Sequence, residues 1–342
     1  MALQQFTNLN FEDIKSSIKD YLRANTDFKD MDFEGSNLSI LIDILAYNSY
    51  STAYNTNMAI NETFIDSATL RENVVSLARN IGYVPRSKRA ARATVNYSLS
   101  GITSSTKQVT IQPGVVANGS VSNINYVFSL PESVTFNAFN GASRGVMVIY
   151  QGQYITNSYV VDNNNPSERY VLPNDSIDTS TISVKIRNSI SDNTTTNYEL
   201  VDNIIGVTST SNIYLLQETT DEKYELLFGD DVFGKKLESG NIIDISYIKT
   251  NGKAGNGVES FSFAGLIKDE DGADETDFRM FLSANEKSSN GDEIEPVESV
   301  KYYAPRLYAA QHRAVTANDY EAIIPSIYPN ISFFKTMYPI FI

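Results

Sequence analysis

The sequence predicts an α+β fold in several domains, and three observations carry that prediction. Apolar residues recur at helical spacing up to residue 92, alternate with polar residues between 93 and 266, and return to helical spacing after 295. A length of 342 residues is enough for two or three domains. We therefore expect an N-terminal helical region, a central β-rich domain of sandwich or barrel-like form, and a small C-terminal α+β unit.

The composition argues against several classes of function. The chain is 42% hydrophobic, carries a formal net charge of −14 and contains no cysteine. The acidic balance argues against nucleic-acid binding, which needs clustered Lys and Arg. The absence of cysteine excludes disulfides, thiolate catalysis and Cys-ligated metals. A chain without cysteine fits a cytosolic protein best. The first residues lack a signal-peptide pattern, and no apolar run is long enough to span a membrane.

Three helices are predicted in the N-terminal region. A first helix fits residues 10–29, with Asn10 as its cap. Two more helices fit the stretch from Gly35 to Gly82, and Ser36 can cap the first of them. Gly82 is placed to end the second, where a left-handed residue is wanted.

The apolar stripes of the second and third helices need something to pack against. The third helix is expected to start at Asp66 or Ser67. The stripes can pack on each other, on a further helix or on a partner chain, so either a small helical core or a helical docking element is predicted. Tyrosine has a large apolar area with a polar tip and is enriched at protein contacts, so the tyrosines of this stretch favour docking. The docking interpretation assigns these residues to an interface: Leu41, Leu45, Tyr47, Tyr50, Tyr54, Leu77 and Ile81.

A basic stretch follows the helices. Between Arg71 and Arg92 six basic residues accompany a single acid, Glu72. Such a stretch is a solvated linker, a seat for an acidic partner surface or a nucleic-acid patch, and the overall charge argues against the last. We expect the basic junction to contact acidic groups of another subunit or of a second copy, through Arg86, Lys88, Arg89 and Arg92.

The central domain is predicted to contain many short strands. Period-two alternation appears at 94–99 and at 108–111, and turn-forming residues fill the gaps. Turns are predicted at 112–114 and 117–120. Short strands between turns are typical of a sandwich or barrel. Further strands are expected at 124–129, 145–150, 157–161, 168–172, 181–187, 197–201 and 212–217.

Glycines mark the turns near the end of this domain. A strand is expected to end at Phe228, with bends at the glycines that follow it and a Gly-rich turn after the next strand. Glycine most simply supplies a positive φ at such bends. We assign structural turns, at least two of them with positive φ, to Gly229, Gly234, Gly240 and Gly255.

The C-terminal part begins with acidic residues. A flexible linker is predicted there, followed by a helix from 295 to 304 that stops before Pro305 and a strand over 308–315. A capping box at Thr316 should start a last helix, which Pro325 ends. The predicted divisions are a docking region at 1–92, a β domain at 93–266, an acidic linker at 267–294 and an α+β unit at 295–342, which looks incomplete.

Several stretches, in this order and spacing, resemble the baseplate J-like family of wedge proteins in contractile-tailed phages. They are the run 41–46 with 64–68 and 78–93, the glycine pattern from Phe228 to Gly257, and 313–321. The resemblance is nearest to the T4-type wedge proteins of the inner baseplate ring, and it extends from about 38 to 321. Related wedge proteins extend further, so we expect this chain to be a portion of a longer one.

This resemblance implies a structural function without chemistry. The helices would bundle with other wedge subunits, including a second copy of the chain. The β domain would help to build the ring around the tube hub, with hub or sheath-initiating proteins as further neighbours. The protein would be assembled in the host cytoplasm, lie in the virion tail baseplate and rearrange at infection.

Two other functions are left open by the residues. A β-rich tail adhesin could recognise host glycans, although the absence of Trp argues against it; a cell-wall-degrading enzyme is the other. The single histidine, His312, is more often a packed residue than a catalytic one. Glu225 with Asp230 or Asp231 is the best carboxylate pair, but sequence spacing does not give the separation that a glycosidase needs. No catalytic, cofactor-binding or metal-binding residue is assigned.

Overall fold

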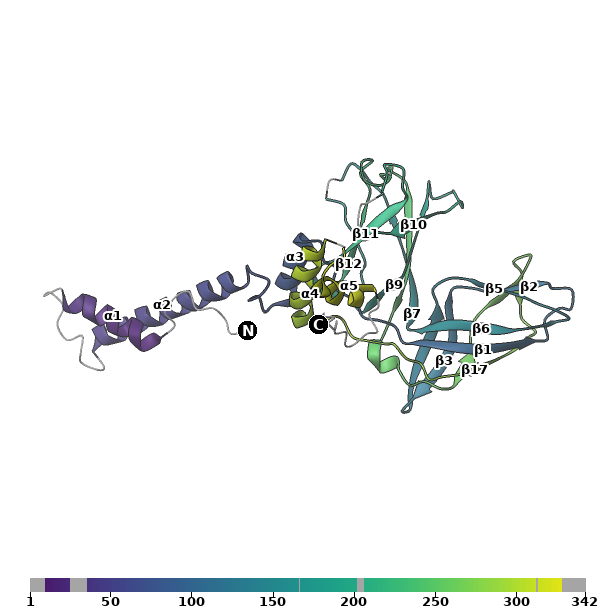
Figure 1. Cartoon of the computed structure of the whole chain (residues 1–342), viewed down its shortest axis with the longest axis horizontal. Helices are drawn as coiled ribbons and strands as arrows, with labels where there is room; N and C mark the ends of the chain where they lie inside the picture. The colour runs from purple at the N-terminus through teal and green to yellow at the C-terminus, as the bar shows by residue number, and fades with distance from the viewer. Residues whose placement is uncertain (1–9, 25–35, 166, 202–205, 312, 328–342) are drawn as a thin grey trace, which may run out of the picture. The chain divides into compact units, whose positions relative to one another are not determined.

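The computed structural model describes residues 10–24, 36–165, 167–201, 206–311 and 313–327. The chain divides into two compact units. The helical unit comprises the residues up to Tyr83 together with Val297–Val315, and the β unit comprises Val84–Pro296 together with the residues from Thr316 onward. N-terminal helices, central β sheets and small C-terminal helices confirm the predicted α+β class (Figure 1).

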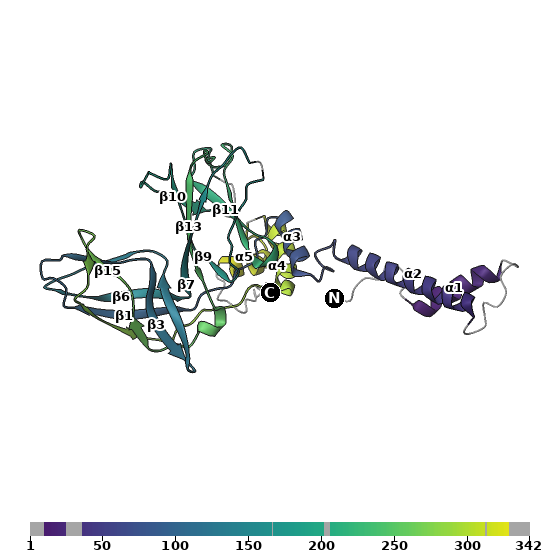
Figure 2. The ribbon, with the colours of Figure 1, turned by 180° about the vertical axis from the view of Figure 1, so that it is seen from behind.

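Two helices, α1 (Phe11–Arg23) and α2 (Asn37–Asn61), open the helical unit. Both begin where the sequence predicts, because the Asn10 and Ser36 side chains accept hydrogen bonds from free backbone N–H groups in the first turn of each helix. Both ribbon views show α1 alongside the N-terminal part of α2 (Figures 1 and 2).

Helix α3 (Arg71–Asn80) begins later than the sequence predicts. Glu62 holds the residues immediately before this helix: its carboxylate accepts hydrogen bonds from the Thr69 backbone N–H at 2.8 Å, from the Thr69 hydroxyl at 2.6 Å and from the N–H of the N-cap residue Leu70 at 3.3 Å. The group that holds the start of α3 therefore comes from the end of α2. The prediction that Asp66 or Ser67 starts the helix is wrong, because that prediction considered only residues adjacent to the helix.

Helix α4 (Val297–Ala310) packs on α3. The prediction that Pro305 ends this helix is wrong, and its last turn occupies the beginning of the predicted strand over 308–315. Burial of one helix face offsets the hydrogen bond that a proline removes. The buried residues of the α3–α4 core are Ala68, Val74, Ala78, Tyr83, Val300 and Ala304.

Helix α5 (Ala317–Ile327) follows. Its predicted capping box is present: the Thr316 backbone N–H donates to Asp319 at 2.7 Å, and the Asp319 backbone N–H donates to the Thr316 hydroxyl at 3.3 Å. The helix continues past Pro325, which was expected to end it. Among the described residues after 295 there are helices and no strand, so the predicted C-terminal α+β unit is helical where it is described.

One half of the β unit contains a six-stranded sheet in the order β14-β3-β4-β6-β1-β17 and a four-stranded sheet in the order β16-β15-β2-β5. Their inward side chains form one core, which includes Phe128 and Ile149. The strands are β1 (Arg92–Ser100), β2 (Gln108–Ile111), β3 (Gly114–Val121), β4 (Ile124–Leu130), β5 (Val134–Asn137), β6 (Ala142–Gln151), β14 (Phe261–Phe263), β15 (Ile267–Asp269), β16 (Asp274–Glu275) and β17 (Arg279–Ala284).

The other half is a seven-stranded sheet in the order β7-β13-β9-β10-β11-β12-β8 with its own core. Its two edge strands approach each other, since the Tyr159 hydroxyl on β7 donates to the Val171 carbonyl on β8 at 2.8 Å. This contact gives the sheet a barrel-like form. The strands are β7 (Gln153–Val160), β8 (Tyr170–Val171), β9 (Ile177–Arg187), β10 (Thr196–Leu200), β11 (Ile213–Glu218), β12 (Tyr224–Phe228) and β13 (Ile242–Lys249).

Two sequence predictions about the β unit are wrong. Residues 117–120 belong to β3 instead of forming a turn. Gly119 is glycine because a Cβ there would lie 2.9 Å from the Ser260 carbonyl oxygen, and the turn itself is made by Ser122 and Asn123, which both have positive φ. The acidic segment 267–294 contains β15, β16 and β17 and is therefore part of the sheets.

The β unit begins before residue 93. Residues 84–92 pair with 289–296 in an irregular two-stranded ribbon whose backbone hydrogen bonds join Arg86 to Glu295, Arg89 to Asp292 and Arg92 to Ser289. The β unit therefore begins at Val84, before the predicted boundary after residue 92. The basic junction belongs to it because its backbone pairs with residues 289–295, at the end of the predicted acidic linker.

Candidate interaction surfaces

Helix α2 leaves large apolar side chains uncovered. Ile42 and Ala46 are buried, whereas Leu41 and Leu45 are 55% and 54% exposed. Over the first turns apolar side chains therefore face every direction, which is typical of a helix that is buried all round. The other exposed apolar residues of this helix are Ile40, Ile44, Tyr47 and Tyr54.

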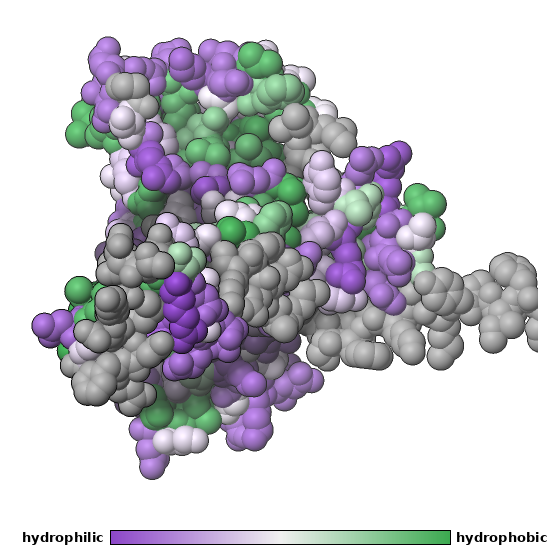
Figure 3. All heavy atoms as spheres, turned by 90° about the vertical axis from the view of Figure 1, so that its left-hand side faces the viewer, coloured by the Kyte–Doolittle hydropathy of each residue, from purple (hydrophilic) through white to green (hydrophobic). Residues whose placement is uncertain are grey.

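The α1–α2 pair does not bury enough to stand alone. No residue of α1 is buried, and the polar link between the helices is a 2.6 Å ion pair of Lys15 with Asp43. An apolar helix packed on one amphipathic helix needs a further partner for its remaining surface. Figure 3 shows one face of the molecule, on which hydrophobic and hydrophilic residues are interspersed. Among the described helices, α2 carries the most exposed large hydrophobic side chains.

The structure separates the predicted docking residues into two groups. Leu41, Leu45, Tyr47 and Tyr54 lie exposed on α2, and Tyr50 is half-buried. Leu77 and Ile81 instead pack against the α3–α4 core. Sequence reasoning missed Ile40 and Ile44, although their four-residue spacing was a usable signal.

The basic junction finds acidic groups within its own chain. The Arg86 backbone N–H donates to the buried Glu295 carboxylate at 2.9 Å, and Lys88 Nζ lies 3.0 Å from Glu293. The ribbon thus brings acids of the same chain beside both residues, and contact with another subunit stays a prediction for them. Arg92 lies over the Tyr150 ring at 5.1 Å.

Arg89 is partly buried among charged residues of both signs. Burial lowers the pKa of its guanidinium, and the like charges of Arg92 and Arg86 lower it further, while Asp178 and Asp292 oppose the shift. For Arg89 and Arg92, contact with another subunit stays a prediction.

Two different physical reasons account for glycine at the four assigned turn positions. Gly234 and Gly240 have φ of 86° and 92°, as predicted for at least two of the four. Gly229 and Gly255 lack a positive φ but leave no room for a Cβ, which at Gly229 would overlap the Gly234 backbone. The turn from 229 to 234 is held further by Asp230, whose carboxylate accepts the Val232 and Phe233 backbone N–H groups.

The carboxylates of Glu225 and Asp230, considered above as a catalytic pair, accept hydrogen bonds from other groups of the β unit. Glu225 is buried and accepts two hydrogen bonds from Arg169, at 2.7 and 2.6 Å, and a third from Gln217 at 2.8 Å. The Asp230 carboxylate has its pKa lowered by the backbone N–H groups that it accepts. His312 lies outside the described residues. Within the described residues no cluster of three His, Asp or Glu could hold a metal ion, and no helix is long and apolar enough to cross a membrane.

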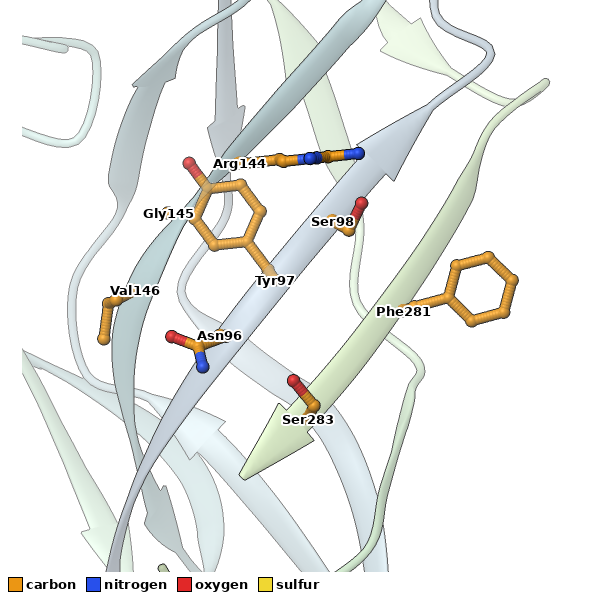
Figure 4. A pocket seen from close by; sticks show the side chains of 8 residues that line it. All are labelled: Asn96, Tyr97, Ser98, Arg144, Gly145, Val146, Phe281 and Ser283. Carbon is orange, nitrogen blue, oxygen red and sulfur yellow. The ribbon is translucent and has the colours of Figure 1, made fainter. Parts of the chain in front are cut away.

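A groove of about 510 Å³ lies on the six-stranded sheet (Figure 4). Its residues come from β1, β6 and β17 and were not singled out in the sequence, because strand order is needed to bring them together. They are Asn96, Tyr97, Ser98, Arg144, Gly145, Val146, Phe281 and Ser283.

The N-terminal helical part of the chain is similar to a known class of domain. Residues 10–83 match the model of the helical domain of gp6-like baseplate wedge proteins. This segment contains α1, α2 and α3, and so it includes the uncovered face of α2.

A particular relative is the baseplate wedge protein gp6 of Enterobacteria phage T4. The two are 27% identical over 353 aligned positions, which cover 95% of this chain and 51% of the relative. The chain thus spans about half the length of that relative. A chain in the baseplate structure of the anti-feeding prophage was also found, with 12% identity, 93% of this chain and 56% of that chain covered, and a TM-score of 0.28.

Proposed function

We propose that the chain is a structural component of a contractile phage baseplate wedge, and that α2 docks it to other wedge subunits. The observation that carries the proposal is the uncovered apolar surface of α2, which lies inside the segment that matches the wedge helical domain. The similarity to the T4 wedge protein over most of the chain supports the same function.

The finer parts of the proposal come from the family resemblance. It assigns the chain to the baseplate J-like family and to the inner baseplate ring, with a second copy of itself among its neighbours and hub or sheath-initiating proteins as further ones. The role is assembly in the host cytoplasm and rearrangement in the virion tail at infection, without catalysis. Arg89 and Arg92 would orient the subunit, since exposed ion pairs contribute only about 0–1 kcal/mol each.

The docking role of α2 is tested with Leu45→Asp in the full chain, co-expressed with the other wedge subunits of its phage. Leu45 is 54% exposed, so the free chain should keep its stability to within about 0.5 kcal/mol. Burying the new carboxylate in an apolar interface costs several kcal/mol, so assembly on a sizing column should fall by at least about 100-fold. Self-association is followed by analytical ultracentrifugation.

Asn55→Asp is the matched control. It adds the same charge to the same helix at an exposed position in the half of α2 where the uncovered face is mostly polar. This variant should assemble like the parent chain. A Leu45→Asp chain that assembles as well as the control would remove the docking role from α2.

A further inference from the structure

On the outer face of the six-stranded sheet, β1 carries short polar side chains, and longer side chains stand on its neighbours β6 and β17. On β1, Asn96 and Ser98 point to this face, since the residues that alternate with them, Val95, Tyr97 and Leu99, are buried in the core. The strand register places Arg144 of β6 and Phe281 of β17 on either side of Ser98. This arrangement makes the groove, which runs along β1.

The charge of the groove is opposite to that of the protein. Its lining holds one charged residue, Arg144, on a chain of net charge −14. A second arginine, Arg279 of β17, lies on the same face of the sheet, opposite Ser100, two residues along β1 from Ser98. Within the described part of the chain, neither Arg144 nor Arg279 makes an ion pair. Both guanidiniums are therefore available to a carboxylate above Ser98 and Ser100.

The walls of the groove are apolar and exposed. Phe281 is 68% exposed and Val146 is 55% exposed, on strands that flank β1. In Figure 4, Arg144 extends from β6 over β1, and Phe281 stands on β17 beyond it. Exposed apolar walls around a few polar groups are a common form of protein contact site.

We propose that this groove binds an extended acidic segment of a neighbouring protein subunit, laid face-on along β1. A carboxylate sits between Arg144 and Arg279, and the side chain two residues further along packs against Val146 and Phe281. The spacing fits because alternate residues of an extended chain lie about 6.6 Å apart on one face, the same repeat as Ser98 and Asn96. The expected recognition pattern is acid, any residue, apolar residue.

Arginine suits this site because its guanidinium pairs with a carboxylate through two parallel hydrogen bonds. The Ser98 and Ser283 hydroxyls lie beside the path and can bond the backbone of the bound segment. The identity of the neighbour as a wedge subunit rests on the proposed function, whereas the acidic chemistry follows from the groove alone.

The test uses the full chain and a fluorescent peptide, Ser-Glu-Ser-Val-Ser-Val-Ser, followed by anisotropy at low salt. A second peptide carries Gln in place of Glu. We expect the Glu peptide to bind at least fivefold more tightly than the Gln peptide, with the difference shrinking as salt screens the charges. Arg144→Glu with Arg279→Glu should abolish the preference, and Phe281→Ala should weaken both peptides.

Lys185→Glu is the control, because it reverses one charge on an exposed strand residue of the seven-stranded sheet. It should leave binding unchanged. Equal affinity for the two peptides, or no binding of either at millimolar concentration, would overturn the proposal. Binding of a sialic acid oligomer through the same arginines, without peptide binding, would make this a glycan site instead. None of these results depends on α2, so they are distinct from failure of the docking test.

Discussion

The carboxylate of Glu62 should make the start of α3 sensitive to acid. It accepts hydrogen bonds from the Thr69 backbone N–H and hydroxyl, from the Leu70 backbone N–H at 3.3 Å and from the Asn73 amide at 2.8 Å. Partial burial works in the opposite direction, but these four bonds lower the pKa of Glu62 from 4.5 to about 2. Glu62→Gln removes the charge and one acceptor oxygen.

The size of the effect follows from that pKa. A drop from 4.5 to about 2 corresponds at most to about 3.5 kcal/mol, since each pKa unit is worth about 1.4 kcal/mol. Solvent screens a group so little buried, so we expect about 1–2 kcal/mol, the usual value of a helix cap. Because the folded-state pKa is the lower one, this stability is present above pH 4.5 and is lost as the pH falls toward 2.

Hydrogen exchange of peptides covering α3 measures the local free energy in the full chain. Glu62→Gln should raise exchange by about 5- to 30-fold at pH 6, and the difference from the parent should close as the pH approaches 2. Asp66→Asn is the control, since Asp66 is exposed in the same connection and makes no hydrogen bond with a described residue. An equal effect of the control, or a difference that does not change with pH, would refute this role of Glu62.

Two further predictions concern the β unit, and urea unfolding of the full chain measures both. Gly234→Ala should lose more than about 1 kcal/mol, because its φ is 86° and a Cβ would lie 2.7 Å from Ile213. At Gly240, which has open space, Ala should cost about 1 kcal/mol and Asn much less; equal losses would mean that φ is not the cause. Arg169→Met should lower the free energy of unfolding, because the buried Glu225 carboxylate loses its cation, and adding Glu225→Met should recover most of the loss. No recovery in the double variant would show that Arg169 acts through packing.

Local patterns in the sequence determined most of the elements. Alternation located β1 and β2, and side-chain oxygens at Asn10 and Ser36 located the starts of two helices. These features depend on residues within a few positions of each other, which is why they can be predicted without the fold. Four of the assigned docking residues, Leu41, Leu45, Tyr47 and Tyr54, lie exposed on α2, whereas the exposed Ile40 and Ile44 were not predicted.

Only the tertiary structure decided features that join distant residues. Pro305 lies inside a helix because burial against α3 outweighs a local stop signal, and Glu62 holds the start of one helix from the end of another. The acidic segment after 267 becomes sheet because β17 pairs with β1, far away in the sequence. That pairing also places Phe281 and Arg144 on either side of Ser98. Strand order is set by long-range burial and backbone hydrogen bonding, and the spacing of residues along one segment does not contain it.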